Sequence, residues 1–520
     1  MPYNVKTDVL VIGCGIAGAI AALTAADQGA RVLVVTGMGD LMEGNTAYAQ
    51  GGIIYKSPHD SPELLTKDII RAGAGRCHVP AVELLAEKGP ALVKKLLIDK
   101  YAIPFDQDEK GRLDFTTEGA HSLSRVIHVA DWTGKAIIRS LVSALKTHPG
   151  IRILKNTTAV DILTLSHHSR NPGDIYREPM CVGIYALNQK KGWVFPIFAK
   201  ETILATGGLG QIYLHTTNPR VARGDGIALA YRAGVRLINL EYVQFHPTTL
   251  FQEDEKRFLI TESLRGEGGI LIRRNGERFM DDIHPMGSLA PRDIVARAIQ
   301  DVMLAHNEPC VYLDVRHLNP DWARVRFPNV YNNCAEYGID ITKKPIPVVP
   351  AAHYSCGGIA VDLMGRASLK RLWAVGEVSC TGVHGANRLA SASLLEGLVW
   401  GYEAGRQSSL NIRRKNDYYF PSIEKWIHEK ETVDPALIYQ DWLTIKYTMW
   451  NYVGLTRTSK RLERALHILR ELQQEVERFY KRGALSDGLI GLRNGVQTAM
   501  AVLFAAQQNR ETRGCHFRVD

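Results

Sequence analysis

A chain of 520 residues with 45% hydrophobic and 22% charged residues has ordinary globular composition and is long enough for two to four domains. Its formal net charge of +9 suits a solvated basic surface or an acidic substrate, and no run of Lys and Arg interleaved with aromatic residues points to nucleic acid. The eight cysteines include no CxxC pair, which argues against an iron–sulfur or zinc site and against a disulfide framework.

The sequence has no signal-peptide pattern, because strand-like residues interrupted by Lys6 and Asp8 begin almost at once. No window of about 18 uncharged apolar residues is present, so we expect no transmembrane helix and no membrane partner. Together with the cysteine pattern, these features predict a protein of the reducing cytoplasm.

A glycine-rich turn lies near the start of the chain. The predicted order is strand, turn, helix and strand, at residues 7–12, 13–18, 19–28 and 31–35. In this context GxGxxG predicts dinucleotide binding, because its glycines allow a tight turn and close approach of a diphosphate to the helix N-terminus. The second strand ends in Thr36-Gly37, with no acidic residue for a ribose diol, which disfavours NAD and leaves the adenosine contact unassigned.

Residues 44–52 (GNTAYAQGG) are too rich in small residues for a helix, and form either a loop laid on a flat ligand or a solvent loop. Further helices are predicted within residues 62–100, at 132–145 and at 227–233. Strands are predicted at residues 153–163, 182–186, 194–198 and 200–205, with a loop at 167–177. A second glycine turn at 205–208 is expected where a two-part dinucleotide domain closes on its ligand.

Between these elements, residues 117–131 gather Glu118, His121, Ser122 and Arg125. Their spacing does not converge on one helix face, which argues against a metal site. The residues alone leave open whether this segment is a polar site or polar surface.

Composition changes in residues 240–350, which we interpret as an inserted domain. His246 stands in an apolar run, where a histidine is either a satisfied core residue or a ligand. A polar, glycine-rich stretch follows at 261–269, and a helix is predicted at 294–304. Arg292 beside Asp293 at the helix start would by default form a cap and a salt bridge.

Residues 350–397 contain a short strand at 372–375 followed by Gly, Ser and Ala, whose small side chains allow a backbone to approach a ligand closely. His353 and Arg388 flank this small-residue surface, and Arg offers a planar fork of donors that suits a carboxylate. Beyond residue 405, amphipathic helices at 433–480 and 486–509 predict a helical bundle.

Taken together, these motifs resemble one family, the flavoproteins of succinate dehydrogenase, fumarate reductase and L-aspartate oxidase. The resemblance covers nearly the whole chain, in the order GCGIAG, NTAYAQGGI, EGAHS, ATGG, GDGIALAYRAG, EYVQFHPT, TESLRGEGG, PRDIVARAI, HYSCGGI, AVGEV, GANRLASASLLEG. It implies an α/β FAD-binding Rossmann-like domain with an inserted α+β capping domain and a C-terminal helical domain. The implied boundaries are 1–239 and 351–405 for the FAD-binding domain, 240–350 for the capping domain and 406–520 for the helical domain.

The resemblance implies FAD as the cofactor and no metal. Asn45 stands where the dehydrogenases carry a histidine bonded to the flavin, so FAD is expected to be held non-covalently. The implied cofactor-binding residues are Gly13, Cys14, Gly15, Ile16, Ala17, Gly18, Asn45, Thr46, Ala47, Tyr48, Ala49, Gln50, Gly51, Gly52, Ala205, Thr206, Gly207, Gly208, Asp225, Glu377, Ser393 and Leu394.

It also implies a site for a dicarboxylate. Arg292 matches the family's proton-shuttling arginine, and the matching substrate-binding residues are Glu118, His246, Thr261, Glu262, His353 and Arg388. Arg and His donors suit two carboxylates, and Glu118 would meet an ammonium group, for which the dehydrogenases need no charge.

Within the family, EGAHS at Glu118 is similar to the loop of the aspartate-oxidising members. The expected reaction is FAD-dependent oxidation of L-aspartate to iminoaspartate, the first step towards quinolinate and NAD. O2 would reoxidise the flavin and give H2O2, or fumarate would and give succinate, and the product would pass to quinolinate synthase. The alternatives are a soluble fumarate reductase or succinate dehydrogenase-type flavoprotein, and a subunit that functions only when docked to an iron–sulfur protein.

Overall fold

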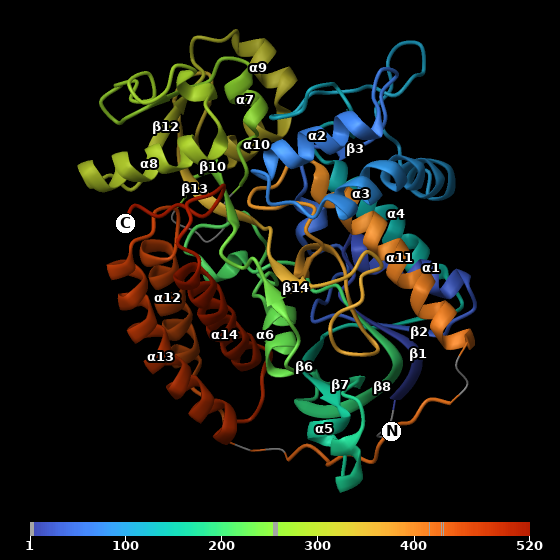
Figure 1. Cartoon of the computed structure of the whole chain (residues 1–520). Helices are drawn as coiled ribbons and strands as arrows, with labels where there is room; N and C mark the ends of the chain where they lie inside the picture. Colours follow the sequence, from blue (N-terminus) through green and yellow to red (C-terminus); the bar gives the residue numbers. More distant parts are fainter. Residues whose placement is uncertain (1–4, 253–257, 415–416, 428, 430) are drawn as a thin grey trace.

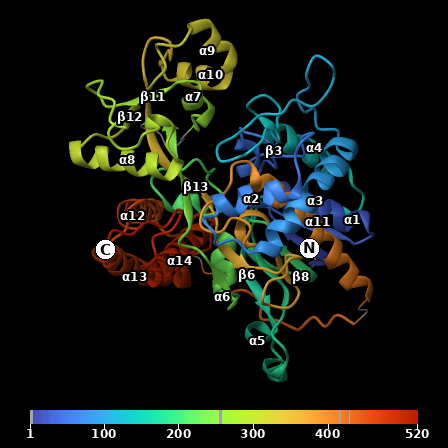
Figure 2. The same ribbon diagram turned by 45° about the horizontal axis from the view of Figure 1, so that its top comes forward.

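The computed structural model describes residues 5–252, 258–414, 417–427, 429 and 431–520, which form three groups in space (Figure 1). A large sheet lies at the lower right with helices α1 to α4 and α11 above it on the right. A smaller sheet with α7 to α10 lies at the top left, and helices α12 to α14 lie at the lower left. The turned view keeps the same three groups (Figure 2). The predicted fold class, an α/β region with an α+β region and a C-terminal helical region, is confirmed.

The first group is built on a seven-stranded sheet in the order β5-β2-β1-β8-β7-β6, with β15 paired to β8. The pairs β5–β2, β2–β1, β1–β8 and β8–β15 are parallel, and β8, β7 and β6 form an antiparallel meander. The bounds are β1 Val5–Ile12, β2 Val32–Val35, β5 Ile151–Leu154, β6 Thr157–Thr164, β7 Cys181–Asn188, β8 Trp193–Leu204 and β15 Leu372–Ala374.

Alternate residues of β1 face opposite sides of this sheet, as strand geometry requires. Val9 and Val11 pack into one core with α1 and α11, whereas Leu10 and Ile12 pack into another with α6 and the C-terminal helices. Burial on both faces explains why residues 9–12 of β1 and the whole of β2 read as continuous apolar runs.

Helix α11 (Ala392–Arg414) crosses α1 (Ile16–Asp27) at close range. A Cβ at Gly401 would lie 2.5 Å from the Ala17 carbonyl oxygen, and one at Gly405 would lie 2.4 Å from that of Ala21. Glycine is therefore needed at both positions, and the crossing brings the N-terminus of α11 to the dinucleotide turn.

The remaining elements of this group lie around the large sheet. They are η1 Asn45–Tyr48, β3 Ile53–Ile54, α2 Pro62–Ala72, α3 Val79–Leu92, a π-helix at Val93–Lys100, β4 Val126–Ile127, α4 Thr133–Thr147, α5 Leu165–His168, η3 Pro172–Tyr176, η4 Gly210–Ile212, α6 Asp225–Arg232, β9 Leu237–Ile238, β14 Gly358–Ala360, η6 Gly376–Val378 and β16 Ser379–Cys380.

The second group has an antiparallel four-stranded sheet in the order β10-β13-β12-β11, with α8 packed on β10. Its elements are β10 Val243–Leu250, α7 Glu262–Gly266, β11 Ile270–Ile272, η5 Gly287–Leu289, α8 Arg292–His306, β12 Val311–Asp314, α9 Pro320–Arg326, α10 Pro328–Glu336 and β13 Ile346–Ser355. A separate apolar core fills this group.

Three helices, α12 (Pro435–Tyr452), α13 (Ser459–Arg482) and α14 (Asp487–Gln508), complete the chain. They pack on one another, and α14 also packs on α6. Among helices of the described residues, α14 alone is long and apolar enough to cross a membrane, but 78% of its apolar window is buried inside the molecule.

Four sequence expectations need correction. The strand predicted at 153–163 is two strands, because Asn156 turns the chain with φ +50°. The strands predicted at 194–198 and 200–205 are one, β8, in which the polar Lys200 is satisfied by Asp8 at 2.9 Å. The loop predicted at 167–177 contains α5 and η3. The domain boundary predicted at 405 falls inside α11, which continues to Arg414.

Candidate active site

The turn between β1 and α1 has the geometry of a diphosphate site. Gly13 has φ +105°, and a Cβ there would lie 2.1 Å from the Ala205 carbonyl oxygen, so only glycine fits. Gly15 provides no capping side chain for α1, although the Ile16 N–H donates to Thr46 Oγ1 at 3.0 Å. A helix N-terminus of this kind suits an anion, and the residues therefore fit the FAD diphosphate.

The predicted flavin-lining segments meet at one carboxylate. Glu377 Oε2 accepts from the Asn45 amide at 2.7 Å, and Oε1 accepts from the Ser355 N–H at 3.1 Å. A Cβ at Gly208 would lie 2.2 Å from Glu377 Oε1, so the second glycine turn reaches the same point. Burial raises the pKa of Glu377 to about 7, against the lowering effect of its two hydrogen bonds.

The other cofactor candidates lie around these contacts. Ser393 Oγ accepts from Arg388 Nη1 at 3.2 Å, and Leu394 is buried in the first turn of α11. Thr206 Oγ1 is buried without a hydrogen-bond partner, and Tyr48 is 58% exposed. Buried positions are Cys14, Ile16, Ala17, Gly18, Thr46, Gly52 and Ala205, and partly or fully exposed ones are Ala47, Ala49, Gln50, Gly51 and Gly207.

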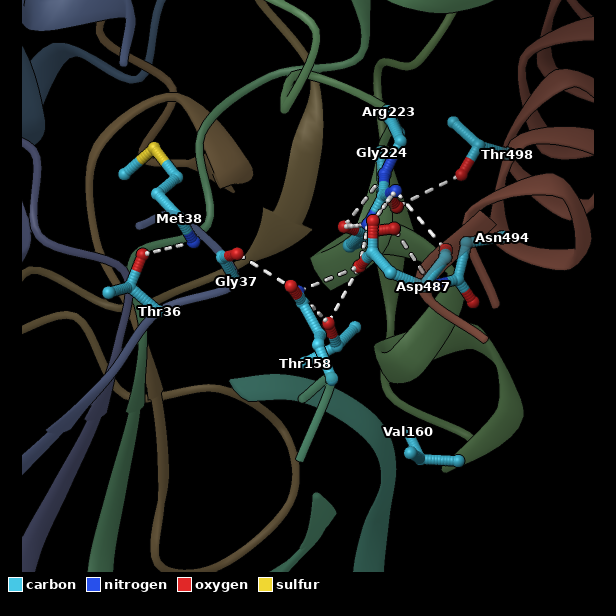
Figure 3. A network of polar contacts seen from close by, with 12 residues as sticks. Thr36, Gly37, Met38, Thr158, Val160, Arg223, Gly224, Asp487, Asn494 and Thr498 are labelled. Atoms are coloured by element: carbon cyan, nitrogen blue, oxygen red, sulfur yellow. Dashed lines mark hydrogen bonds and ion pairs between the residues drawn. The ribbon is translucent and has the colours of Figure 1, made fainter. Parts of the chain in front are cut away.

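Asp225, a predicted cofactor residue, is held by protein partners at the start of α6. Its Oδ2 accepts from Arg223 Nη2 at 2.9 Å, and its Oδ1 accepts from the Asn494 amide at 2.8 Å. Arg223 Nη1 also donates to Asp487 Oδ2 at 2.8 Å, and Thr158 Oγ1 donates to Asp487 Oδ1 at 2.6 Å (Figure 3). The network joins α6 and β6 to the first residue of α14.

This network reaches Thr36-Gly37 at the end of β2, where the sequence has no acidic residue for a ribose diol. Gln189 Nε2 donates to the Gly37 carbonyl oxygen at 2.9 Å and to Thr158 Oγ1 at 2.8 Å. Thr36 Oγ1 accepts from the Met38 N–H at 3.2 Å, which forms a local turn. Asp487 Oδ1 lies 3.9 Å from where a Cβ of Gly37 would stand. Asp487 is therefore connected to Gly37 through hydrogen bonds of Thr158 and Gln189 (Figure 3).

His246 on β10 and His353 on β13 bring two imidazole rings together in an edge-on arrangement. The rings of His246 and His353 lie 5.6 Å apart, and His353 Nδ1 lies 2.8 Å from Thr217 Oγ1. Burial holds the pKa of both imidazoles well below the ordinary value, and neighbouring guanidinium groups lower it further. Both rings are therefore neutral near pH 7 and can donate or accept one hydrogen bond to a ligand.

Arg388 is buried beside these rings, with its guanidinium 4.7 Å from the centre of the Tyr354 ring. Its Nε donates to Gln244 Oε1 at 3.3 Å. Burial lowers the pKa of Arg388, and the charge of Arg292 lowers it further. An anionic ligand would relieve the repulsion between these two cations.

Glu262 links two arginines. Its Oε2 accepts from Arg292 Nε at 2.5 Å and contacts Nη2 of the same side chain, while its Oε1 lies 3.8 Å from Arg265 Nη2. Burial lowers the pKa of Arg265 to about 10, whereas the carboxylates of Glu262 and Glu118 raise that of Arg292 despite burial. Thr261, predicted to bind substrate, caps α7 by accepting from the Ser263 N–H at 3.4 Å.

Glu118 lies against the flavin-lining loop. Its Oε2 accepts from Ser391 Oγ at 2.6 Å, and a Cβ at Gly51 would lie 2.3 Å from its Oε1. Because its charge raises the pKa of Arg292, it also belongs to the electrostatic surroundings of the cationic cluster. Glu118 is thus a second carboxylate, after Glu262, in the electrostatic surroundings of Arg292.

The sequence analysis missed Arg265, Tyr354 and Ser391. Arg265 stands three residues after Glu262, a spacing that places both on one helix face, so that signal was present. Tyr354 follows His353 directly but gave no signal of its own. Ser391 has φ +55°, which no sequence pattern reveals.

Two family models match this chain. One, described as FAD binding domain, matches residues 8–394, and one described as fumarate reductase flavoprotein C-term matches residues 443–520. Both matched regions contribute residues to the network around Arg223 and Asp487.

Curated relatives and solved structures are similar over almost the whole chain. The L-aspartate oxidase 1 of Ralstonia nicotianae is 43% identical, over 99% of this chain and 95% of the relative. The chloroplastic L-aspartate oxidase of Arabidopsis thaliana is 39% identical, over 99% of this chain and 81% of the relative. An E. coli quinol fumarate reductase structure superimposes with a TM-score of 0.88 at 30% identity, covering 99% of this chain and 92% of that one.

Proposed function

The chain belongs to the FAD-binding flavoprotein family that contains L-aspartate oxidases and fumarate reductase flavoproteins, and from this we propose that it oxidises L-aspartate to iminoaspartate. The curated relatives that bear the oxidase name support this choice of substrate. The reaction would be the first step towards quinolinate and NAD.

The carboxylate of Glu118 is the observation that carries the proposal. Aspartate has two carboxylates and one ammonium group, so its binding needs cations and one anion. Arg292 and Arg388 offer the cations, His246 and His353 offer neutral donors, and Glu118 offers the anion. A dicarboxylate without an amine would offer Glu118 no cationic group, which disfavours such a molecule as the preferred substrate.

FAD, when bound, supplies the two-electron chemistry by accepting a hydride from the substrate α-carbon. The chain binds and orients the substrate so that this carbon faces the flavin, with one carboxylate on Arg388 and the neutral imidazoles. Glu118 holds the ammonium group, from which a proton must leave as the imine forms. We assign FAD a non-covalent attachment, because Asn45 donates to Glu377 and has no nucleophilic ring nitrogen.

Arg292 is the candidate proton shuttle. A free arginine is a poor acid because its pKa lies above about 12. Glu262 bridges Arg292 to Arg265, whose pKa burial lowers to about 10, and this arrangement gives a proton a route out of the site. Protonation of a carbon of fumarate, the reverse type of reaction, would use the same route.

Several wider features belong to the same proposal. The flavin would be reoxidised by O2, which gives H2O2, or by fumarate, which gives succinate, and the iminoaspartate would pass to quinolinate synthase. Residues 240–350 would act as a capping domain over the substrate, and the protein would work in the cytoplasm.

A soluble fumarate reductase is the second candidate, because the cationic cluster would serve fumarate equally well and the E. coli fumarate reductase structure is closely similar. An anaerobic titration separates the two functions. L-aspartate should bleach the flavin absorbance of the purified chain, and succinate should do so much more slowly. An oxidised spectrum with aspartate, together with bleaching by succinate, would refute the proposal. Turnover of the single chain with O2 would exclude a subunit that works only when docked to an iron–sulfur protein.

A further inference from the structure

The side chain of Ser391 links the flavin-lining loop to the carboxylate of Glu118. Ser391 Oγ donates to Glu118 Oε2 at 2.6 Å and accepts from the Gly52 N–H at 3.2 Å. One hydroxyl can do both, because it has one donor and two acceptor positions. The orientation of the Glu118 carboxylate is therefore tied to the backbone of the loop predicted to lie on the flavin.

A second contact holds the same two segments together. His121 Nε2 lies 3.0 Å from the Ala390 carbonyl oxygen, one residue before Ser391. Burial lowers the pKa of His121, so the ring is neutral and its Nε2–H donates to that carbonyl. Residues 118–121 are thus fastened to residues 390–391 at two points, which restricts the freedom of Glu118.

The backbone at Ser391 has a conformation that is unfavourable for any residue with a side chain. Its φ of +55° lies in the left-handed region, where a residue other than glycine is strained. Glycine at this position would avoid the strain but would lose both hydrogen bonds. Gly51 completes the arrangement, since a Cβ there would lie 2.3 Å from Glu118 Oε1 and displace the carboxylate.

The charges around Glu118 explain why such a restraint matters. The attraction between Glu118 and Arg292 raises the pKa of Arg292, which already pairs with Glu262. A freely rotating Glu118 would turn towards Arg292, fill the place of a substrate carboxylate and neutralise the cation that should bind it. The hydrogen bond from Ser391 opposes that rotation.

We propose that Ser391 is a positioning residue that holds Glu118 against the flavin-lining loop and away from Arg292, and so makes the site selective for dicarboxylates that carry an amine. The inference rests on the proposed function, because it assumes that Glu118 receives the substrate ammonium group. Ser391 acts through Glu118 and makes no bond to the substrate.

Three variants of the FAD-loaded enzyme test this role. Ser391→Gly removes the hydroxyl and relieves the backbone strain, and Ser391→Thr keeps a hydroxyl. Ser408→Ala is the matched control, because Ser408 is a buried serine of α11 whose Oγ donates to the Gly405 carbonyl oxygen, far along the helix from the site. For each variant, stopped-flow flavin reduction gives the Kd for L-aspartate and the limiting rate, and absorbance titration gives the Kd for succinate.

We expect Ser391→Gly to raise the Kd for aspartate about tenfold, in keeping with loss of a hydrogen bond to a charged group, while the Kd for succinate changes less than about twofold. The preference for aspartate over succinate should therefore fall by the ratio of these two changes in Kd. Ser391→Thr should recover at least part of it, Ser408→Ala should match the wild type, and the melting temperature of Ser391→Gly should not fall. A merely structural role would lower the melting temperature and weaken both ligands together.

The outcomes distinguish failure of the proposed function from failure of the proposed role of Ser391. If wild-type flavin stays oxidised with aspartate, the proposed function and this inference fail together. If the wild type is reduced but Ser391→Gly binds aspartate as tightly as the wild type, or loses aspartate and succinate equally, only the role of Ser391 is refuted.

Discussion

Glu262 and Arg292, thirty positions apart in sequence, form an ion pair through a single carboxylate oxygen. Arg292 Nε donates to Glu262 Oε2 at 2.5 Å, and Arg292 Nη2 contacts the same oxygen. The other oxygen of Glu262 faces Arg265, at 3.8 Å. Once Arg292 has given up a proton, the Glu262 carboxylate can take a proton from Arg265 and pass it to Arg292 without that proton crossing solvent. Glu262 can therefore relay a proton to Arg292 in addition to holding it by charge attraction.

We predict that Glu262→Gln slows fumarate reduction by at least about 100-fold, because an amide cannot take up and release the proton. The Kd for succinate should change less than about fivefold, since neither Arg388 nor the imidazoles are altered. Steady-state assays with a reduced dye and absorbance titrations check the two quantities. Glu267→Gln, in the same segment and near Arg326 at 3.8 Å, is the control and should behave as the wild type. A normal rate in Glu262→Gln would remove this residue from the proton route.

We predict that Glu118→Gln lowers kcat/KM for L-aspartate about 100-fold, which corresponds to loss of an ion pair with the ammonium group. Fumarate reduction should stay within about threefold of wild type, because fumarate has no amine. The exposed Glu109→Gln in the same loop is a charge-matched control and should leave both activities unchanged. Equal loss of both activities in Glu118→Gln would contradict its assignment to the amine.

We predict that Asp487→Asn weakens FAD binding about tenfold, because Asp487 supports Gly37 through Thr158 and Gln189. Fluorescence of released FAD during dilution measures the change. Glu477→Gln is the control, since Glu477 of α13 accepts from Arg493 Nε of α14 at 2.8 Å but does not reach β2. Equal FAD retention in the Asp487 variant and the wild type would show that this network only joins helices.

We predict that the FAD-free chain loses stability between about pH 4.5 and 7 on account of Glu377. Burial raises its folded pKa from 4.5 to about 7, so in this window the unfolded chain has released a proton that the folded chain keeps. Rising pH therefore favours unfolding, by at most about 3 kcal/mol above pH 7. The apparent melting temperature of Glu377→Gln, relative to wild type, should increase from pH 5 to pH 8. A difference that stays constant with pH would contradict the assignment.

Local patterns predicted much of this fold. The turn at Gly13 is confirmed because its elements are adjacent in sequence and strongly apolar, and the predicted helices at 132–145 and 294–304 agree with α4 and α8 within a few residues. Failures came where tertiary contacts override the local signal. The polar Lys200 suggested a break between two strands. In the structure it lies inside β8 and pairs with Asp8 of β1.

The residue types of the site could be predicted from the sequence, but the contacts between these residues could not. Residue types and the family resemblance led to His246, His353, Arg292 and Arg388, and the structure places these cations and imidazoles close together. The bond from Ser391 to Glu118 joins residues 273 positions apart and depends on a left-handed backbone, so no local pattern could indicate it. Which residues bind substrate remains a prediction.

The position of Asp487 at the start of the last helix affects how the enzyme is made. The ribosome synthesises the segment around Gly37 early, whereas the carboxylate that supports it emerges only with α14. A nascent chain stalled before α14 has the diphosphate turn but not this support, so its grip on the adenosine half of the cofactor should be incomplete. We therefore expect full cofactor retention only once α14 has been synthesised and has brought Asp487 to this segment.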